Sequence, residues 1–236
     1  TPMRHHNAQL TRSLDRVVLK ALSKAPEERF STVLQFVESA TRYLRRDTVS
    51  VEHSEHLLPT DFHSAVPLGE YSYWVGIPPQ GETPLLNACL RLFEGTNNLG
   101  QSVTFALLIN PGSSHSFGTI QAKVSSLIQG LDRLSAVFMT SSAPSVAASM
   151  TLLHGRYAPK AKLLCSENTW LQASHYRLPE DNFISVDKYP RGFKVPTGQT
   201  LHPIVLPYCP DAGSTILYDP ETHILYSGAL FSQFSS

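Results

Sequence analysis

The segment Ala136–Met150 constrains the fold of this chain more than any other part of its sequence. An apolar run ends at Thr140, and a helix of small residues is expected from about Val146. The polar turn between them, 141–145, contains serines and a proline. In an α/β sheet such a turn follows the carboxyl end of a strand, where ligands and catalytic groups usually bind. Because this turn has no His, Cys, Asp or Glu, the sequence predicts the position of a site without the side chains for its chemistry.

The fold class follows from the order of strand and helix patterns after residue 66. Aromatic and β-branched residues between Pro, Gly and Asn turns predict strands, and apolar residues at helical spacing predict helices. Strands come first, then strands and helices alternate, and strands return at the end, which is typical of a layered α/β sandwich. The expected strands are 71–77, 86–93, 103–109, 135–140, 161–165, 183–186, 201–206, 214–218 and 223–227, and the expected helices are 116–130, 146–157 and 167–176.

The serines of the central turn offer little catalytic chemistry by themselves. Ser141 and Ser142 have no base near them in the sequence, and the chain has no G-x-S-x-G nucleophile elbow. Ser145 is expected to cap the following helix, because its hydroxyl can accept a hydrogen bond from a helical N–H group.

The N-terminal residues predict two amphipathic helices. The pattern over 10–44 is helical and is interrupted at Pro26. Residues 14–30 resemble the last two helices of the catalytic domain of bacterial serine/threonine protein kinases, through a K-A-L-x-K-x-P-x-x-R-F run that starts at Lys20. This resemblance implies that Arg29 forms a buried ion pair with a glutamate in the kinase large lobe. The chain has no Gly-rich nucleotide loop, no catalytic HRD-type Asp and no DFG motif, so we expect it not to transfer phosphate.

A second resemblance covers the body of the chain. Leu-Ile-Asn-Pro-Gly at 108–112, the stretch 161–179 with its C-S-E-N-T-W and H-Y-R-L-P segments, and Y-D-P-E-T-H-I-L-Y-S-G-A-L-F at 218–231 resemble landmarks of the metallo-β-lactamase superfamily. Within it, they are most similar to the oxygen-binding di-iron domain of flavodiiron proteins and some bacterial sensors. The resemblance implies an αββα sandwich, here incomplete at the C-terminus.

The same resemblance locates the metal ligands, and this chain lacks them. Members of that family bind two irons through an HxExDH motif, a later His, an Asp and a final His. The final His would fall beyond the end of the sequence. The other positions fall on Ser141, Ala143, Ser145, Val146, Tyr208 and Ala229. None of these offers the imidazole, thiolate or carboxylate that such a site requires. We therefore expect no bound metal or other cofactor and no catalytic residue.

Two other metal hypotheses were weighed. His202, Asp211 and His223 could serve as atypical ligands of a di-iron or zinc enzyme or oxygen sensor, provided that the fold brings them together. The linker 46–66 contains His53, Glu55, His56 and His63, but their spacing is not that of the helical HExxH motif, which favours a solvated linker.

Composition argues against several partners. The 19 Lys and Arg residues balance the 19 Asp and Glu residues, so neither nucleic acid nor an anionic membrane would be attracted over a broad face. No apolar run approaches the roughly 20 residues that span a bilayer, and no secretory signal begins the chain. The cysteines, Cys89, Cys165 and Cys209, are odd in number and widely spaced, which favours buried, reduced thiols in the cytoplasm.

These observations predict a kinase-like helical segment at 1–45, a linker at 46–66 and a metallo-β-lactamase-like domain without metal ligands at 67–236. The leading hypothesis is a non-catalytic sensory, regulatory or scaffolding module of a bacterial serine/threonine kinase. It would bind an upstream kinase domain, another protein, a second copy of itself or a small ligand. A third hypothesis treats the chain as a fragment of a larger kinase whose activity is phosphotransfer.

Overall fold

The computed structural model of the chain describes residues 12–21, 23, 28–30, 35, 39, 62–78, 87–96, 100–206 and 211–228. The chain divides into two compact units, Thr1–Leu58 and Pro59–Ser236. In the stretches that the structure describes, no helix has the length and apolar character needed to cross a membrane.

The N-terminal unit contains the helix α1, Arg12–Ala21, which lies inside the predicted helical pattern. Val17 is buried in this unit, and the Lys20 ammonium lies 4.6 Å from the centre of the Phe30 ring. Arg29 is exposed, and its Nε donates a hydrogen bond to the carbonyl of Ser23 at 2.8 Å. The buried ion pair that the kinase resemblance implies for Arg29 would need the large lobe of a kinase, so it stays a prediction. Most of the predicted second helix lies outside the described residues.

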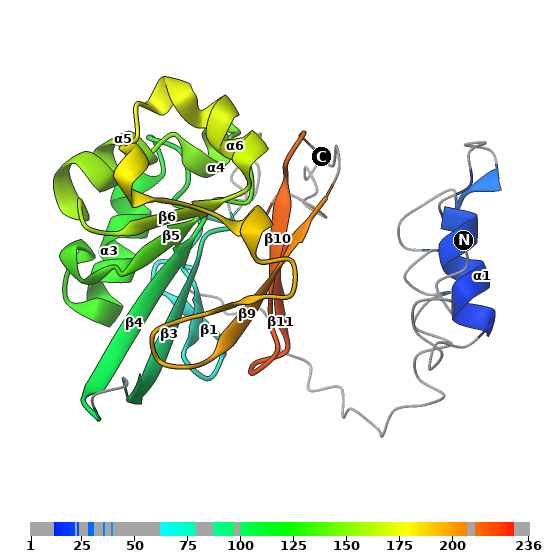
Figure 1. Ribbon diagram of the computed structural model, residues 1–236, viewed down its shortest axis with the longest axis horizontal. Coiled ribbons are helices and arrows are strands. Elements are labelled where there is room, and N and C mark those ends of the chain that lie inside the picture. Colours follow the sequence, from blue (N-terminus) through cyan, green and yellow to red (C-terminus); the bar gives the residue numbers. More distant parts are fainter. Residues whose placement is uncertain are drawn as a thin grey trace. The chain divides into compact units, whose positions relative to one another are not determined.

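A seven-stranded sheet forms the centre of the larger unit, with its strands in chain order (Figure 1). The first four pair in antiparallel fashion, and β4 to β7 are parallel. The strands are β1 Val66–Gly69, β2 Ser72–Trp74, β3 Cys89–Thr96, β4 Ser102–Ile109, β5 Ala136–Phe138, β6 Lys162–Cys165 and β7 Phe183–Ser185. The predicted switch from consecutive strands to alternating strands and helices thus coincides with the change from antiparallel to parallel pairing.

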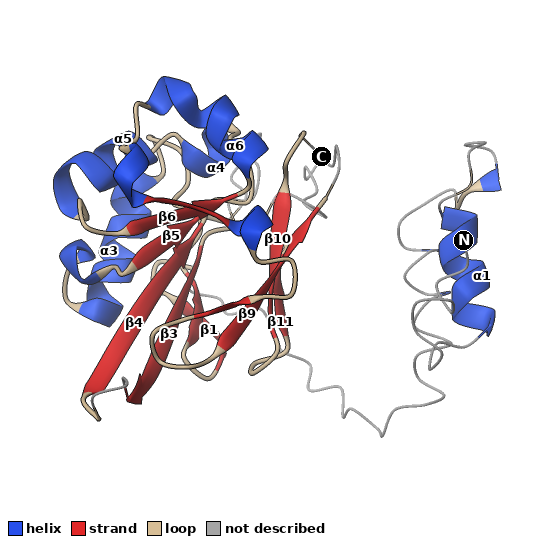
Figure 2. Ribbon diagram, in the orientation of Figure 1, coloured by secondary structure: helices blue, strands red, loops and turns tan. Residues whose placement is uncertain are grey.

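A smaller sheet of four antiparallel strands, in the order β11-β10-β9-β8, packs on one face of the larger sheet (Figure 2). Helices cover the opposite face. The strands of the smaller sheet are β8 Phe193–Lys194, β9 Thr200–Val205, β10 Thr215–Asp219 and β11 Ile224–Tyr226. The helices are α3 Phe117–Ile128, α4 Pro144–Ala147, α5 Met150–Leu152 and α6 Glu167–Gln172, with a π-helical turn at Leu153–Tyr157 and 3-10 turns at Leu131–Arg133, Ala173–Tyr176, Glu180–Asn182 and Val186–Lys188.

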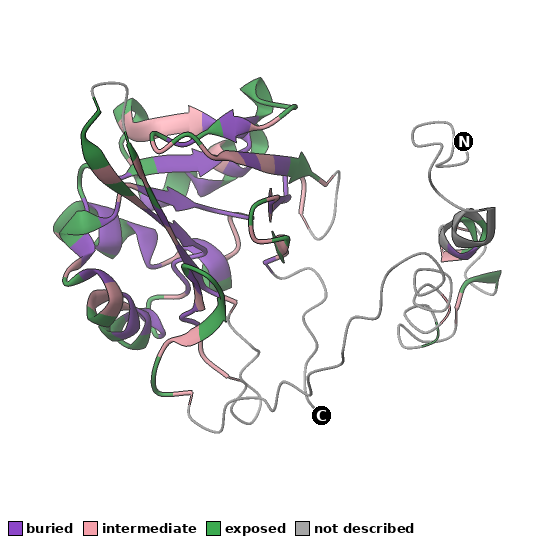
Figure 3. Cartoon of the chain, turned by 90° about the horizontal axis from the view of Figure 1, so that it is seen from below, coloured by how far each residue is buried: buried purple, intermediate pink, exposed green. Residues whose placement is uncertain are grey.

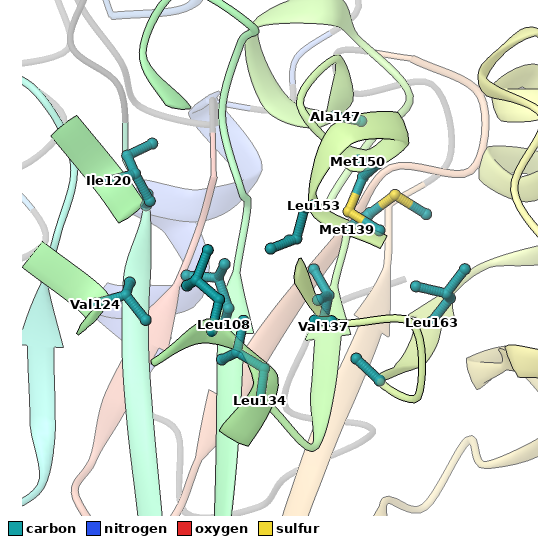
Figure 4. Packing of buried hydrophobic residues seen from close by; sticks show 14 of the residues in the cluster. Leu108, Ile120, Val124, Leu134, Val137, Met139, Ala147, Met150, Leu153 and Leu163 are labelled. Carbon is teal, nitrogen blue, oxygen red and sulfur yellow. The ribbon is translucent and has the colours of Figure 1, made fainter. Parts of the chain in front are cut away.

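Two apolar cores lie on the two faces of the larger sheet, because successive strand residues point to opposite faces. Leu108 packs under the helices, whereas its neighbours Leu107 and Ile109 pack between the sheets. Figure 4 shows Leu108 with Val124 of α3 in the helix-side core, and Figure 3 shows the buried residues concentrated in the strands. This layered arrangement confirms the predicted metallo-β-lactamase-like α/β fold.

The segment 146–157, predicted as one helix, differs from the prediction. It consists of α4, α5 and the π-helical turn, and it begins two residues earlier, at Pro144. Proline is favoured in the first turn of a helix, where its missing N–H leaves no hydrogen bond unmade. Ser145 therefore lies inside the first turn, and the N-cap is Ala143 without a side-chain bond. The prediction that Ser145 caps this helix is wrong.

A buried ion pair joins the two sheets. Arg91 of β3 is 2% exposed and Asp219 of β10 is fully buried, and the Arg91 Nε lies 2.7 Å from Asp219 Oδ2. The Arg91 Nη2 also contacts Glu221, whose side chain is half exposed. Asp219 accepts two further hydrogen bonds, from the N–H of Glu221 and the hydroxyl of Thr222. The charges are therefore well compensated, which a buried pair requires.

We expect Asp219→Ala to lower the free energy of unfolding by about 3–5 kcal/mol, because it leaves the buried guanidinium of Arg91 without its main partner. Urea denaturation followed by circular dichroism measures this. Glu221→Gln is the matched control, and its cost should stay below about 1 kcal/mol because the side chain of Glu221 is half exposed. Equal losses in the two variants would contradict a special role for the buried pair.

Candidate functional site

The carboxyl ends of the parallel strands β4, β5 and β6 meet at one edge of the larger sheet, as the sequence predicted. The turns that follow begin at Asn110, Met139 and Ser166. Residues 211–215, which lead into β10 of the smaller sheet, bond to these turns. We call this assembly of turns the carboxyl edge.

Four of the six residues that the resemblance assigns to metal-ligand positions lie in the turn after β5 and in α4. Ser141 is buried, and its Oγ accepts a hydrogen bond from the N–H of Ala143 at 3.3 Å. Val146 is buried in the helix-side core, whereas Ser145 is exposed. The other two predicted positions, Tyr208 and Ala229, lie outside the described residues. Iron does not fit the four described positions, because two serine hydroxyls, a methyl group and an isopropyl group provide no anionic or imidazole donor.

A chain of buried hydrogen bonds connects the turns at this edge. Asn110 adopts the left-handed conformation with φ 58°, and its Oδ1 accepts a hydrogen bond from the N–H of Thr140 at 2.9 Å. The carbonyl of Thr140 accepts from the N–H of Thr215 at 2.8 Å. Asn87, whose carbonyl accepts from the Asn110 amide, itself donates to the carbonyl of Gly228. These bonds tie the two sheets together at the carboxyl edge.

A second group of hydrogen bonds closes the edge on the α6 side. The hydroxyls of Ser166 and Thr169 both donate to the carbonyl of Gly213. Ser142 donates to the side-chain oxygen of Gln172, and its own carbonyl accepts from the Tyr176 hydroxyl at 3.1 Å. The polar groups of the turns are therefore bonded to one another, and they hold the strand ends in place.

Two glycines permit this close contact. Gly228 has φ 61°, and a Cβ there would lie 2.3 Å from Thr140 Oγ1. Gly213 has φ 84°, and a Cβ there would lie 2.5 Å from the Cβ of Asn168. The sequence does not predict the roles of Asn110, Thr140 and these glycines, because a single small or amide residue forms no periodic pattern. The Asn-Pro-Gly segment is the one feature of the sequence that indicates a turn here.

The atypical ligands considered from sequence do not come together. His223 contacts Tyr218, with His223 Nδ1 and the Tyr218 hydroxyl 3.3 Å apart, and His202 lies opposite Tyr218 in the β9–β10 register. Asp211 precedes the other end of β10, which is roughly 13 Å long at about 3.3 Å per residue. Metal ligands must lie within about 2–2.5 Å of a common point. Among the described residues, no group of three or more His, Cys, Asp or Glu could hold a metal ion.

The cysteines offer no nucleophile in the described part of the chain. Cys89 and Cys165 are free and buried, as predicted, and Cys209 lies outside the described residues. Burial raises the pKa of the Cys89 thiol to about 12 and also raises the pKa of Cys165. Both thiols are therefore protonated near neutral pH, and a protonated thiol is a poor nucleophile or metal ligand.

The linker histidines add no site among the described residues. His63 is exposed, whereas His53, Glu55 and His56 lie outside the part of the chain that the structure describes. The hypothesis of a solvated linker stays a prediction for these three.

The two stacked sheets, the helical layer and the turns at the carboxyl edge define a domain of the metallo-β-lactamase superfamily. Within it, a family model described as "ODP family beta lactamase" matches residues 97–236, which is more than half of the sequence. The chain belongs to this family. No protein in the search of curated proteins matches it.

Solved structures share the fold. The flavodiiron protein from Giardia intestinalis superposes with a TM-score of 0.57 at 18% identity, over 70% of this chain and 39% of that one. A structure described as a peroxy diiron species of the chemotaxis sensor ODP superposes with a TM-score of 0.51 at 19% identity, over 69% of this chain and 61% of that one. Rubredoxin oxygen:oxidoreductase from Desulfovibrio gigas superposes with a TM-score of 0.55 at 14% identity, over 69% of this chain and 40% of that one. The match thus spans less than two thirds of each of these relatives, and it shows the fold alone.

Substitution of Gly228 by Ala should destabilise the protein by about 2–4 kcal/mol, because the added Cβ needs a strained backbone and overlaps Thr140. Thermal and urea unfolding measure the loss. Gly118→Ala is the control, since Gly118 lies in α3 with open space around it and should leave stability unchanged or raise it by up to about 1 kcal/mol. A Gly228→Ala variant as stable as the parent would show that the edge is not closely packed.

Proposed function

We propose that this chain is a non-catalytic, metal-free sensory or regulatory module of a bacterial serine/threonine protein kinase, located in the cytoplasm. It would act by binding a partner or a ligand on a fold whose relatives bind iron. The observation that carries the proposal is that Ser141, Ala143, Ser145 and Val146, which the resemblance assigns to metal-ligand positions, offer no imidazole, thiolate or carboxylate.

The contacts of the carboxyl edge support this proposal. A metal centre requires side chains with free lone pairs that converge on one point. Here Ser141 bonds to the local backbone, Val146 packs into the core, and Ser142 bonds to Gln172. The edge is stabilised by neutral hydrogen bonds between the turns, so the protein can fold without the charge compensation that a metal would supply.

The N-terminal sequence supports the association with a kinase. The segment 14–30 carries the K-A-L-x-K-x-P-x-x-R-F run of kinase C-terminal helices, and α1, Arg12–Ala21, ends on the first two residues of that run. A regulatory domain placed directly after a kinase could bind that domain, another protein or a second copy of the chain. A sensory role is consistent with one structural neighbour, which is described as a chemotaxis sensor.

Metal analysis tests the first part of the proposal. After incubation with Fe²⁺ or Zn²⁺ and desalting, the purified chain should retain less than about one tenth of an equivalent of either metal, because the ligand positions lack suitable donors. Inductively coupled plasma mass spectrometry gives the stoichiometry.

The chemotaxis sensor ODP, treated in parallel, is the control that should retain iron, since its solved structure is described as a peroxy diiron species. Retention of one or two equivalents by this chain, lost on substitution of His202, Asp211 or His223, would instead establish a site with atypical ligands.

The proposed association with a kinase predicts that an intact kinase domain is encoded upstream of Thr1. We expect the preceding coding sequence to contain the Gly-rich loop, the catalytic Asp and the DFG motif that this chain lacks. Deletion of 59–236 from that polypeptide should change the rate of autophosphorylation, measured with labelled ATP, while the kinase domain stays folded. A preceding sequence without kinase motifs, or a rate unaffected by the deletion, would contradict the regulatory role.

A further inference from the structure

A pocket of about 260 Å³ opens between the two sheets, away from the carboxyl edge. Its lining includes Ala136 and Lys162, the first residues of β5 and β6, and both residues of β8. The carboxyl edge lies at the other ends of β5 and β6. The pocket therefore shares no residue with the turns in which the family places its metal ligands.

The wall of this pocket is mainly apolar. Leu164, Phe193 and Val195 are buried and form its inner surface, whereas Phe105 and Ile184 are half-buried. These side chains belong to strands of both sheets or to the residues that follow β8. An apolar surface enclosed between two rigid sheets is typical of sites for small ligands.

Two lysines provide the charge. Lys162 and Lys194 belong to the pocket lining, and both residues are exposed to solvent. The Lys162 Nζ lies 3.5 Å from the backbone carbonyl of Asp181, which carries no net charge. Within the described residues, neither ammonium forms an ion pair with a carboxylate, and no Asp or Glu belongs to the pocket lining. A carboxylate from a ligand could therefore pair with these groups.

We propose that this pocket binds a small amphipathic carboxylate, with its apolar part between the sheets and its carboxylate at Lys162 and Lys194. Because a water molecule takes about 30 Å³ in the liquid, the volume suits a ligand of on the order of ten non-hydrogen atoms. An aliphatic or aromatic monocarboxylic acid fits this description. The inference does not depend on the absence of metal, since metal content and ligand binding are measured separately.

Octanoate is a suitable probe, because it combines one carboxylate with an unbranched apolar chain of about the required size. Titrated into the whole chain and followed by isothermal titration calorimetry, it should bind saturably with one site per chain. Lys162→Gln and Lys194→Gln should each weaken binding by about threefold to tenfold, because each removes one cation beside the carboxylate. Ile184→Trp should abolish it by filling the half-open side of the pocket.

Three controls make the test specific. Arg177→Gln removes an exposed positive charge from outside the pocket and should leave affinity unchanged. Octan-1-ol has a similar chain without the charge and should bind more weakly than octanoate. Unfolding curves confirm that each variant is folded. The site would be overturned if octanoate binding does not saturate. It would also be overturned if the Ile184→Trp variant and both lysine variants bind octanoate with the affinity of the parent. Octan-1-ol binding as tightly as octanoate would overturn the role of the lysines.

Discussion

The buried pair between Arg91 and Asp219 is the contact on which the alignment of the two sheets depends. Removal of two charges from water costs several kcal/mol per ion, so such a pair persists only where other groups complete its hydrogen bonding. Here Arg91 also donates to the carbonyl of Leu92, and the turn after β10 donates to Asp219. The pair therefore links β3 of the larger sheet to β10 of the smaller sheet at a point where both charges are compensated.

With the sheets aligned in this way, the start of β10 meets the ends of the parallel strands. In this chain the turns at this meeting point bond to one another. Asn110, Thr140 and Thr215 satisfy one another's backbone and amide groups, and Gly228 allows the close approach. Buried polar groups must be hydrogen-bonded to be tolerated, so these bonds are a condition for burying the turns.

The two ends of the sandwich therefore differ in what they offer a ligand. Among the described residues, the turns of the carboxyl edge have their polar groups bonded to one another. The opposite end has an apolar pocket whose cations, Lys162 and Lys194, lack a carboxylate partner among the described residues. A sensory function of this domain would on these grounds use the pocket between β6 and β8.

The sequence by itself determined the fold class and most of the main elements. Strong periodicity located 103–109 and 116–130 within a few residues of β4 and α3, but it missed the breaks in 146–157, because a local pattern does not register the packing that forms a π-helical turn. Only the tertiary structure decided which groups the turns at the carboxyl edge bond to. The partners of Thr140 are up to about 90 residues away in sequence, and contacts over such separations depend on how the two sheets are stacked.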